Sequence, residues 1–327
     1  MKNIFYLVVL GLMLAACREP FPALPATPTP TPTATPTPTP TPETPENFTV
    51  AFIGDQGLGS DSQAVLQLIE DEGADMVLHQ GDFSYNDDPD TWDQQINDIL
   101  GDSFPYFASI GNHDEAAWSG YQQKLQTRLD KISGASCSGD LGVQAACTYQ
   151  GIFFILSGVG TMGSGHEDYI TTQLAQTDKI WRICSWHKNQ RFMQVGDKTN
   201  EVGWTAYDNC RLGGAIIATA HEHSYSRTYL MSNIENQTVV STSSTLTLDA
   251  GQTFVFVSGL GGNSIRAQND SLAANPWWAS VYTSTQNANF GALFCIFNYQ
   301  GTENTAHCYF KDIDGSTPDT FDLISNL

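Results

Sequence analysis

The feature that most constrains the fold of this chain is a repeated one, in which a short apolar run stops at polar residues of the kind that bind metals. In one case, Met76-Val77-Leu78 leads into Gly81-Asp82-Phe83-Ser84-Tyr85. Four further runs end in the same way, at Ile53-Gly54-Asp55, Ile110-Gly111-Asn112-His113-Asp114, Cys184-Ser185-Trp186-His187 and Thr219-Ala220-His221-Glu222-His223. Because side chains at the carboxyl ends of strands point into one crevice of an α/β protein, we expect these residues to converge.

The order of the apolar runs predicts the fold class. Strands and helices alternate in the first half of the globular region, beginning with a buried strand over 49–53 and a helix up to about Glu72. Strands dominate later, over 238–240, 253–257, 292–298 and 306–311. We therefore predict an α/β fold, a layered α-β-β-α sandwich of two mixed sheets.

Residues 1–17 have the pattern of a lipoprotein signal peptide. A single charge at Lys2 precedes an apolar stretch that is shorter than the roughly 20 residues of a membrane-spanning helix. The sequence Leu14-Ala15-Ala16-Cys17 resembles the cleavage box of bacterial lipoproteins, in which the Cys is lipidated. We expect an exported protein, held at the cell surface or in the periplasm by an N-terminal lipid anchor on Cys17. The alternative is a soluble secreted protein with an ordinary cleavage site.

Residues 18–46 form a Thr/Pro-rich linker and residues 47–327 a single domain. The alternation of Thr and Pro favours polyproline II, which at about 3.1 Å per residue makes a spacer on the order of 80 Å long. The chain has 35 acidic and 14 basic residues, a formal net charge of −21. This excess argues against nucleic-acid binding through a basic face.

The cysteine count suits an oxidising compartment. Without Cys17, six of the seven Cys remain, an even number that predicts disulfides in an exported chain. Six Cys allow fifteen pairings, so the sequence leaves the connectivity open. The pairing that we favour joins Cys295 to Cys308 across a turn, and then Cys137 to Cys147 and Cys184 to Cys210 by proximity. No CxxC spacing supports the alternative of a Cys metal site.

The residues at the run ends predict a centre with two metal ions. The carboxylate of Asp82 has two oxygens and can bridge ions about 3.5–4 Å apart. His221 and His223 are separated by one residue, so both leave the chain on the same side and reach different ions. Asn112 offers an amide oxygen and His187 a further imidazole.

The ordered set GDQG, GDFSY, GNHD, a lone His at a strand end and HEHSYSR resembles the calcineurin-like metallophosphoesterases, and within them the purple acid phosphatases. The resemblance spans Asp55 to Arg227. It implies a metallophosphoesterase-like sandwich with two ion sites. One ion would be held by Asp55, Asp82, Tyr85 and His223, and the other by Asp82, Asn112, His187 and His221.

Two positions point to the purple enzymes within this superfamily. Gly57 stands where most relatives have a His ligand, and Tyr85 matches the Tyr of the purple enzymes. A phenol has a pKa near 10, so binding as phenolate calls for a hard, highly charged ion. We expect Fe³⁺ with a divalent Zn, Mn or Fe ion, the alternative being that Tyr85 only packs through its hydroxyl.

The resemblance also implies a mechanism, in which a metal-bound hydroxide attacks phosphorus in line. His113 would protonate the leaving alkoxide, or alternatively orient a ligand. The plant-like enzymes have further His residues soon after the lone metal His, and an extra β domain ahead of the catalytic one. Here no His closely follows His187, and we expect the Thr/Pro-rich linker to stand in place of that domain. We therefore expect His166, Asn189 or Arg191 to contact the substrate instead.

These observations predict a surface-anchored phosphatase that acts on phosphomonoesters. A phosphodiesterase or nucleotide hydrolase is an alternative, because the same ligands serve both reactions. A non-catalytic metal-binding surface lipoprotein is the alternative from another class. The sequence determines neither the natural substrate nor the oligomeric state.

Overall fold

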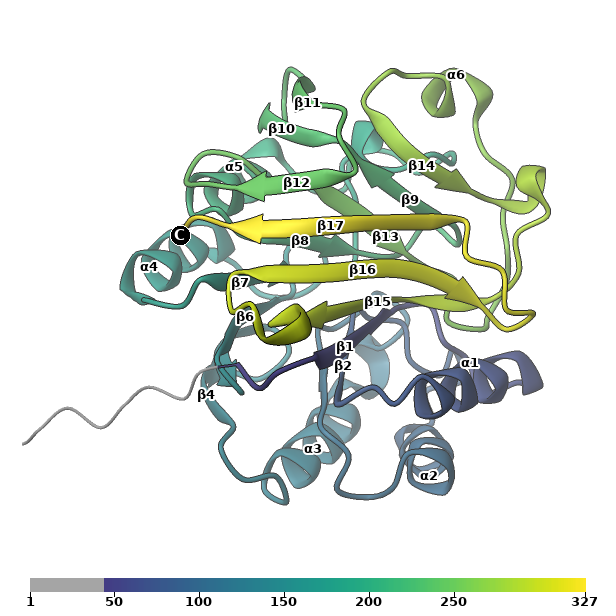
Figure 1. Cartoon of the computed structure of the whole chain (residues 1–327). Helices are drawn as coiled ribbons and strands as arrows, with labels where there is room; N and C mark the ends of the chain where they lie inside the picture. Colours follow the sequence, from purple (N-terminus) through teal and green to yellow (C-terminus); the bar gives the residue numbers. More distant parts are fainter. Residues whose placement is uncertain (1–43) are drawn as a thin grey trace, which may run out of the picture. The chain divides into compact units, whose positions relative to one another are not determined.

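Two mixed β-sheets packed against each other form the centre of the computed structural model, which describes residues 44–327 (Figure 1). The order of the first sheet is β12 (Thr245–Leu248), β17 (Asp319–Ser325), β16 (Thr305–Asp312), β15 (Gly291–Phe297), β1 (Phe48–Ile53), β2 (Met76–His79) and β3 (Tyr106–Ala108). The order of the second is β14 (Trp278–Tyr282), β9 (Tyr225–Thr228), β13 (Val255–Ser258), β8 (Ile216–Thr219), β7 (Trp181–Ser185), β6 (Ile152–Ser157), β5 (Gln144–Tyr149) and β4 (Ser136–Asp140). A separate hairpin joins β10 (Leu230–Asn233) to β11 (Thr238–Ser241).

Each sheet contains a parallel part, and these parts carry the sequence runs described above. The strands β1, β2 and β3 are parallel to one another. In the second sheet β6, β7, β8 and β13 are also parallel. The carboxyl ends of parallel strands lie at one edge of a sheet, and this places the polar run ends together.

Helices cover the outer faces of both sheets. The helices α1 (Ser60–Asp71), α2 (Pro89–Ile99) and α3 (Trp118–Leu129) lie beside the first sheet, where α1 contacts β15 and α3 contacts β3 (Figure 1). The helices α4 (His166–Gln176) and α5 (Trp204–Leu212) cover the second sheet through β5, β6 and β8. A short helix, α6 (Asp270–Ala273), precedes β14. The predicted α-β-β-α sandwich is therefore confirmed.

Aromatic side chains fill the space between the sheets. Phe52 of β1 meets Phe256 of β13 edge to face at 5.2 Å between ring centroids, and Trp181 meets Phe297 at 4.9 Å. All four side chains are buried. Such pairs add about 0.5–1.5 kcal/mol to the stabilisation from burial, so they fix how one sheet lies on the other.

A buried ion pair also joins the two sheets. Arg227 in β9 donates two hydrogen bonds to the carboxylate of Asp319 in β17, at 2.7 and 2.8 Å. The hydroxyl of Tyr225 donates to the same carboxylate at 2.7 Å. Tyr225 and Arg227 thus connect the segment after His223 to β17 of the first sheet.

The six cysteines of the domain form the favoured disulfides, Cys137–Cys147, Cys184–Cys210 and Cys295–Cys308. The first and third lie between neighbouring antiparallel strands, β4 with β5 and β15 with β16. The second ties β7 to α5. This pairing confirms the one predicted from proximity.

Several elements were not predicted. Helix α4, which begins at His166, and helix α5 lack a strong apolar pattern in the sequence. The strand β17 alternates buried and exposed residues and includes two Asp, so it lacks a continuous apolar run. The apolar run that leads to Ile110 forms only a short strand, β3 at Tyr106–Ala108.

The predicted signal peptide, the lipidated Cys17 and the linker up to residue 43 lie outside the described residues. Within residues 44–327, no helix combines the length and the apolar character that crossing a membrane requires.

Candidate metal centre

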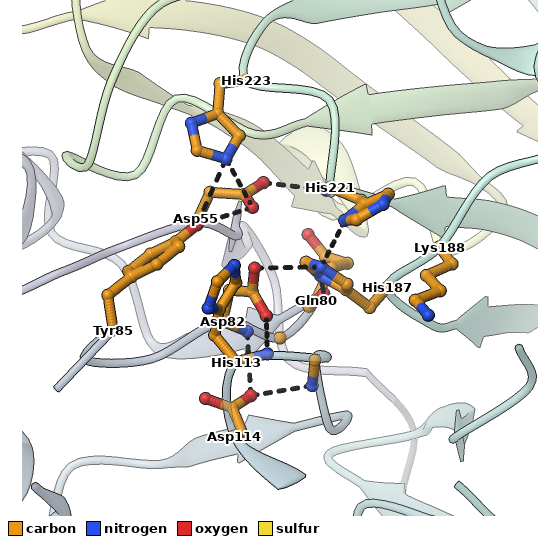
Figure 2. A network of polar contacts seen from close by, with 12 residues as sticks. Asp55, Gln80, Asp82, Tyr85, His113, Asp114, His187, Lys188, His221 and His223 are labelled. Atoms are coloured by element: carbon orange, nitrogen blue, oxygen red, sulfur yellow. Dashed lines mark hydrogen bonds and ion pairs between the residues drawn. The ribbon is translucent and has the colours of Figure 1, made fainter. Parts of the chain in front are cut away.

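Six of the seven predicted ligands, Asp55, Asp82, Tyr85, His187, His221 and His223, meet where strands of both sheets end (Figure 2). Asp55 follows β1 and Asp82 follows β2 in the first sheet, while His187 follows β7 and His221 follows β8 in the second. The side chains of Asp55, Asp82, His187, His221 and His223 are buried. The site therefore lies across the two sheets.

One group of donor atoms consists of Asp55, Tyr85 and His223. The Tyr85 hydroxyl donates to Oδ1 of Asp55 at 2.9 Å and lies 3.2 Å from Nε2 of His223. The same His223 nitrogen is 3.3 Å from Oδ1 of Asp55. These three residues, together with Asp82, are the ones predicted to hold one ion.

A second group consists of Asp82, His187 and His221. Nε2 of His187 lies 3.2 Å from Oδ2 of Asp82 and 3.0 Å from Nδ1 of His221. One donor atom from each residue lies within 4.8 Å of the others, as a metal site requires. The other oxygen of Asp82 accepts a hydrogen bond from the backbone N–H of His113 at 2.9 Å. The bridging role of Asp82 stays a prediction.

The side-chain oxygen of Asn112, a further predicted ligand, has no hydrogen-bond partner in the part of the chain that the structure describes. This Oδ1 atom is buried. Buried polar atoms are nearly always paired, and leaving one unpaired costs about 1–3 kcal/mol. A bound cation would satisfy this oxygen.

The donor atoms fit metal ions in spacing and in kind. Two ligand atoms on the same ion at about 2.0–2.2 Å are roughly 3 Å apart. The three distances in the first group are 2.9, 3.2 and 3.3 Å, and His187 lies 3.2 and 3.0 Å from its two partners in the second. Carboxylate, phenol, amide and imidazole donors suit Fe and Zn rather than a soft ion.

The backbone at four of these residues is in the left-handed region. The φ angles are 58° at Asp55, 63° at Asp82, 59° at Tyr85 and 69° at His221. Each such residue costs on the order of 1–3 kcal/mol and persists only where its surroundings enforce it. Strain of this kind is typical of functional sites.

Asp114 enforces the conformation of the Asp82 loop. Its carboxylate accepts hydrogen bonds from the backbone N–H groups of Asp82 at 2.9 Å, Phe83 at 2.8 Å and Gly111 at 2.7 Å. Gly81 and Gly111 lie back to back here, since a Cβ on Gly81 would come within 2.6 Å of the Gly111 nitrogen. Only glycine allows this approach, so the GD and GN motifs are a packing unit as well as a source of ligands.

Electrostatics keep both carboxylates charged. Burial alone would raise the pKa of Asp55 and of Asp82, but His223 beside Asp55 and His187 beside Asp82 lower both pKa values below the usual range. Burial opposes the charged form of His187 too, yet Asp82 raises the pKa of His187 to about 9. Burial, together with His187, lowers the pKa of His221 to about 2.

Tyr85 is a neutral phenol in the structure. Burial and the neighbouring Asp55 carboxylate raise the pKa of Tyr85 well above its usual value. Binding as phenolate therefore requires a cation strong enough to displace this proton.

His113 lies at the rim of the centre. It is exposed, and its ring lies against the ring of Tyr85 with 4.6 Å between centroids. Its backbone N–H is bound to Asp82, so its position is tied to that ligand.

The structure does not bring the three predicted substrate residues into contact with these donors within residues 44–327. His166 is buried at the start of α4, with its ring nitrogens on Ser157 and the Met162 carbonyl. Asn189 is buried and donates to the Thr219 hydroxyl. Arg191 donates to the Lys198 carbonyl.

A charged residue that no sequence pattern predicts, Glu201, lies next to the donors, and Lys188 lies next to Glu201. Oε2 of Glu201 is 2.9 Å from Nε2 of His221, and Oε1 of Glu201 is 3.9 Å from the Lys188 ammonium. Glu201 belongs to a loop 14 residues after His187, and no sequence pattern marks it. Only tertiary structure brings it to the centre.

Comparisons with known proteins agree with this geometry. A family model described as calcineurin-like phosphoesterase matches residues 48–225, more than half of the chain. No curated protein sequence matches the chain.

Three solved structures share the fold. The purple acid phosphatase PPD1 from yellow lupin (Lupinus luteus) seeds has a TM-score of 0.63 at 16% identity, over 85% of this chain and 53% of the lupin chain. GAP50, the anchor in the inner membrane complex of Plasmodium, has a TM-score of 0.56 at 13% identity, over 86% and 89%. PhoD has a TM-score of 0.52 at 13% identity, over 83% and 71%. The chain thus spans about half the length of the lupin protein.

Proposed function

Because the chain belongs to the calcineurin-like phosphoesterase family, we propose that it is a metal-dependent phosphatase that hydrolyses phosphomonoesters at a two-ion centre. The observation that carries this proposal is the arrangement of donors. Two groups of three donor atoms lie at distances that suit ligands on one ion, and Asn112 offers a further buried oxygen without a hydrogen-bond partner among residues 44–327.

Each donor group would hold one ion. Asp55, Tyr85 and His223 would bind the first, and Asn112, His187 and His221 the second, with Asp82 shared between them. Two such ions supply Lewis acidity, because they make water a stronger acid and offset the charge of a phosphoryl group. The buried, water-poor setting of the donors strengthens this electrostatic effect.

Iron suits the first group. The Tyr85 phenol gives up its proton only to a highly charged cation, and this favours Fe³⁺ over a divalent ion. The second group has two imidazoles and an amide, which suit Zn²⁺, Mn²⁺ or Fe²⁺.

His113 would protonate the leaving oxygen of the ester. Its ring is exposed and lies at the edge of the donor groups, against Tyr85, where a substrate can reach it. The Asp82–His113 backbone contact holds it close to the proposed shared ligand. General acids of this kind contribute about 10²–10⁴-fold to a rate.

We further propose that Cys17 is lipidated and that the linker holds the domain away from a membrane surface. The similar Plasmodium protein is an anchor in a membrane complex, and this makes a non-enzymatic surface role the second candidate. A phosphodiesterase activity is the third, because nothing in the donor set separates monoesters from diesters.

Hydrolysis assays with metal-replete protein test the three candidates. We expect p-nitrophenyl phosphate to be hydrolysed faster than bis(p-nitrophenyl) phosphate, and an Asp82→Asn variant to hydrolyse neither. Faster hydrolysis of the diester would favour the phosphodiesterase. No hydrolysis of either ester by protein that contains both ions would favour the non-enzymatic role.

A further inference from the structure

The two ring nitrogens of His221 contact different residues on opposite sides of the ring. Nδ1 lies 3.0 Å from Nε2 of His187, on the side of the second donor group. Nε2 lies 2.9 Å from Oε2 of Glu201, on the side away from that group. Nδ1 is therefore the nitrogen of His221 that a metal would meet.

We propose that Glu201 is a positioning residue that holds the proton of His221 on Nε2 and aims Nδ1 at the second ion. This inference rests on the proposed two-ion centre. A carboxylate only accepts hydrogen bonds, so Nε2 of a neutral imidazole beside it must carry the proton. The lone pair of Nδ1 is then free to bind a cation. A carboxylate behind an imidazole also makes that imidazole a stronger ligand.

The loop that carries Glu201 is tied to both strands that carry the histidines. The backbone N–H of Glu201 donates to the Asn189 carbonyl at 3.1 Å, two residues after His187. The Asn189 side chain in turn donates to the hydroxyl of Thr219 at 2.9 Å, two residues before His221. Glu201 is thus fixed relative to its partner, and its side chain is only 25% exposed.

Among the donor histidines within residues 44–327, only His221 has a carboxylate, that of Glu201, at its outer nitrogen. The outer nitrogen of His223 faces the hydroxyl of Ser264, and the outer nitrogen of His187 faces the Gln80 carbonyl. Both of these partners are neutral. Loss of the Glu201 carboxylate should therefore lower the affinity for the second ion and leave binding of the first ion unchanged.

Metal binding tests this inference without an activity assay. Zinc affinity is measured by titration of protein that keeps its iron, and the content of both metals by elemental analysis after dialysis. We expect Glu201→Ala to weaken zinc binding by about 10–100-fold with the iron content unchanged. Glu201→Gln keeps an acceptor oxygen but not the charge, so we expect a loss of a few fold.

Two matched variants serve as controls. Lys188→Ala removes a cation close to Glu201 and should leave zinc affinity unchanged. Ser264→Ala removes the outer partner of His223 and should leave zinc affinity unchanged as well. In the metal-free wild type, the ¹⁵N shifts of the His221 ring should show the proton on Nε2, whatever the fate of the variants.

Each contrary result overturns the inference. Wild-type zinc affinity in both Glu201 variants would do so, as would an equal loss of zinc and iron in a folded variant. A proton on Nδ1 of His221 in the wild type would also exclude it. If the wild type binds both ions but hydrolyses no ester, the proposed function fails while the role of Glu201 stands.

Discussion

Nε2 of His187 and Oδ2 of Asp82 lie 3.2 Å apart, and both side chains are buried. In the metal-free protein this contact is an ion pair, because Asp82 raises the pKa of His187 against the effect of burial. A proton on His187 then occupies the side of the imidazole that a metal needs. Metal binding and protonation of His187 are therefore mutually exclusive.

This pair predicts how the stability of the metal-free protein depends on pH. The pKa of His187 is 6.5 when unfolded and about 9 when folded, so its contribution is complete below pH 6.5 and is lost as the pH rises through 9. We expect the free energy of unfolding to fall by up to roughly 3 kcal/mol over this range. Urea denaturation in the presence of a chelator measures it. The same fall in His187→Asn would contradict the assignment.

Substitution of Asn112 should affect the stability of the metal-free protein and its metal affinity in different ways. Its unpaired buried oxygen costs about 1–3 kcal/mol in the metal-free protein, so we expect Asn112→Ala to leave the metal-free protein as stable or more stable. The same variant should lose affinity for the second ion. Thermal unfolding with and without metal gives both quantities. Full zinc affinity in Asn112→Ala would show that this oxygen is not a ligand.

Tyr85→Phe should remove any visible colour from the iron-loaded protein. The visible absorption band comes from charge transfer from a tyrosinate to Fe³⁺. It requires the phenolate oxygen, which this variant lacks. The hydrogen bond to Asp55 disappears as well, so iron content after dialysis should fall. Visible spectra of both proteins at equal iron content are the measurement. A wild type without such a band would mean that Tyr85 only packs.

The role of His113 can be read from leaving groups. If His113 protonates the leaving oxygen, His113→Ala should slow the hydrolysis of esters with poor leaving groups by about 10²–10⁴-fold. Hydrolysis of p-nitrophenyl phosphate, which has a good leaving group, should be slowed far less. Rates of alkyl and p-nitrophenyl esters are compared in wild type and variant. Equal losses on both would indicate that His113 orients a ligand instead.

The strands and the donors could be predicted because both are encoded locally. An apolar run that ends in Gly-Asp or Gly-Asn specifies a buried strand and the side chain that follows it. The parallel order of β1, β2 and β3 then places Asp55, Asp82 and Asn112 at one edge of the first sheet. The alternation in β17 was missed because its two Asp interrupt the apolar pattern.

The remaining residues of the site depend on tertiary structure. Glu201 reaches His221 from a loop, and its backbone N–H is held there by the Asn189 carbonyl. Asn189 and Arg191 are close to His187 in sequence, yet their side chains face Thr219 and Lys198. Closeness along the chain does not set the direction of a side chain.

The bidentate pair of Arg227 and Asp319 has a consequence for the order of biosynthesis. Arg227 follows the last donor, His223, by four residues, whereas Asp319 is made more than ninety residues later. Until Asp319 emerges from the ribosome, a buried guanidinium next to the donor segment lacks its counterion. The donor segment therefore depends on a strand made long after it, so a chain that stops before β17 is not expected to hold the donors in their final arrangement.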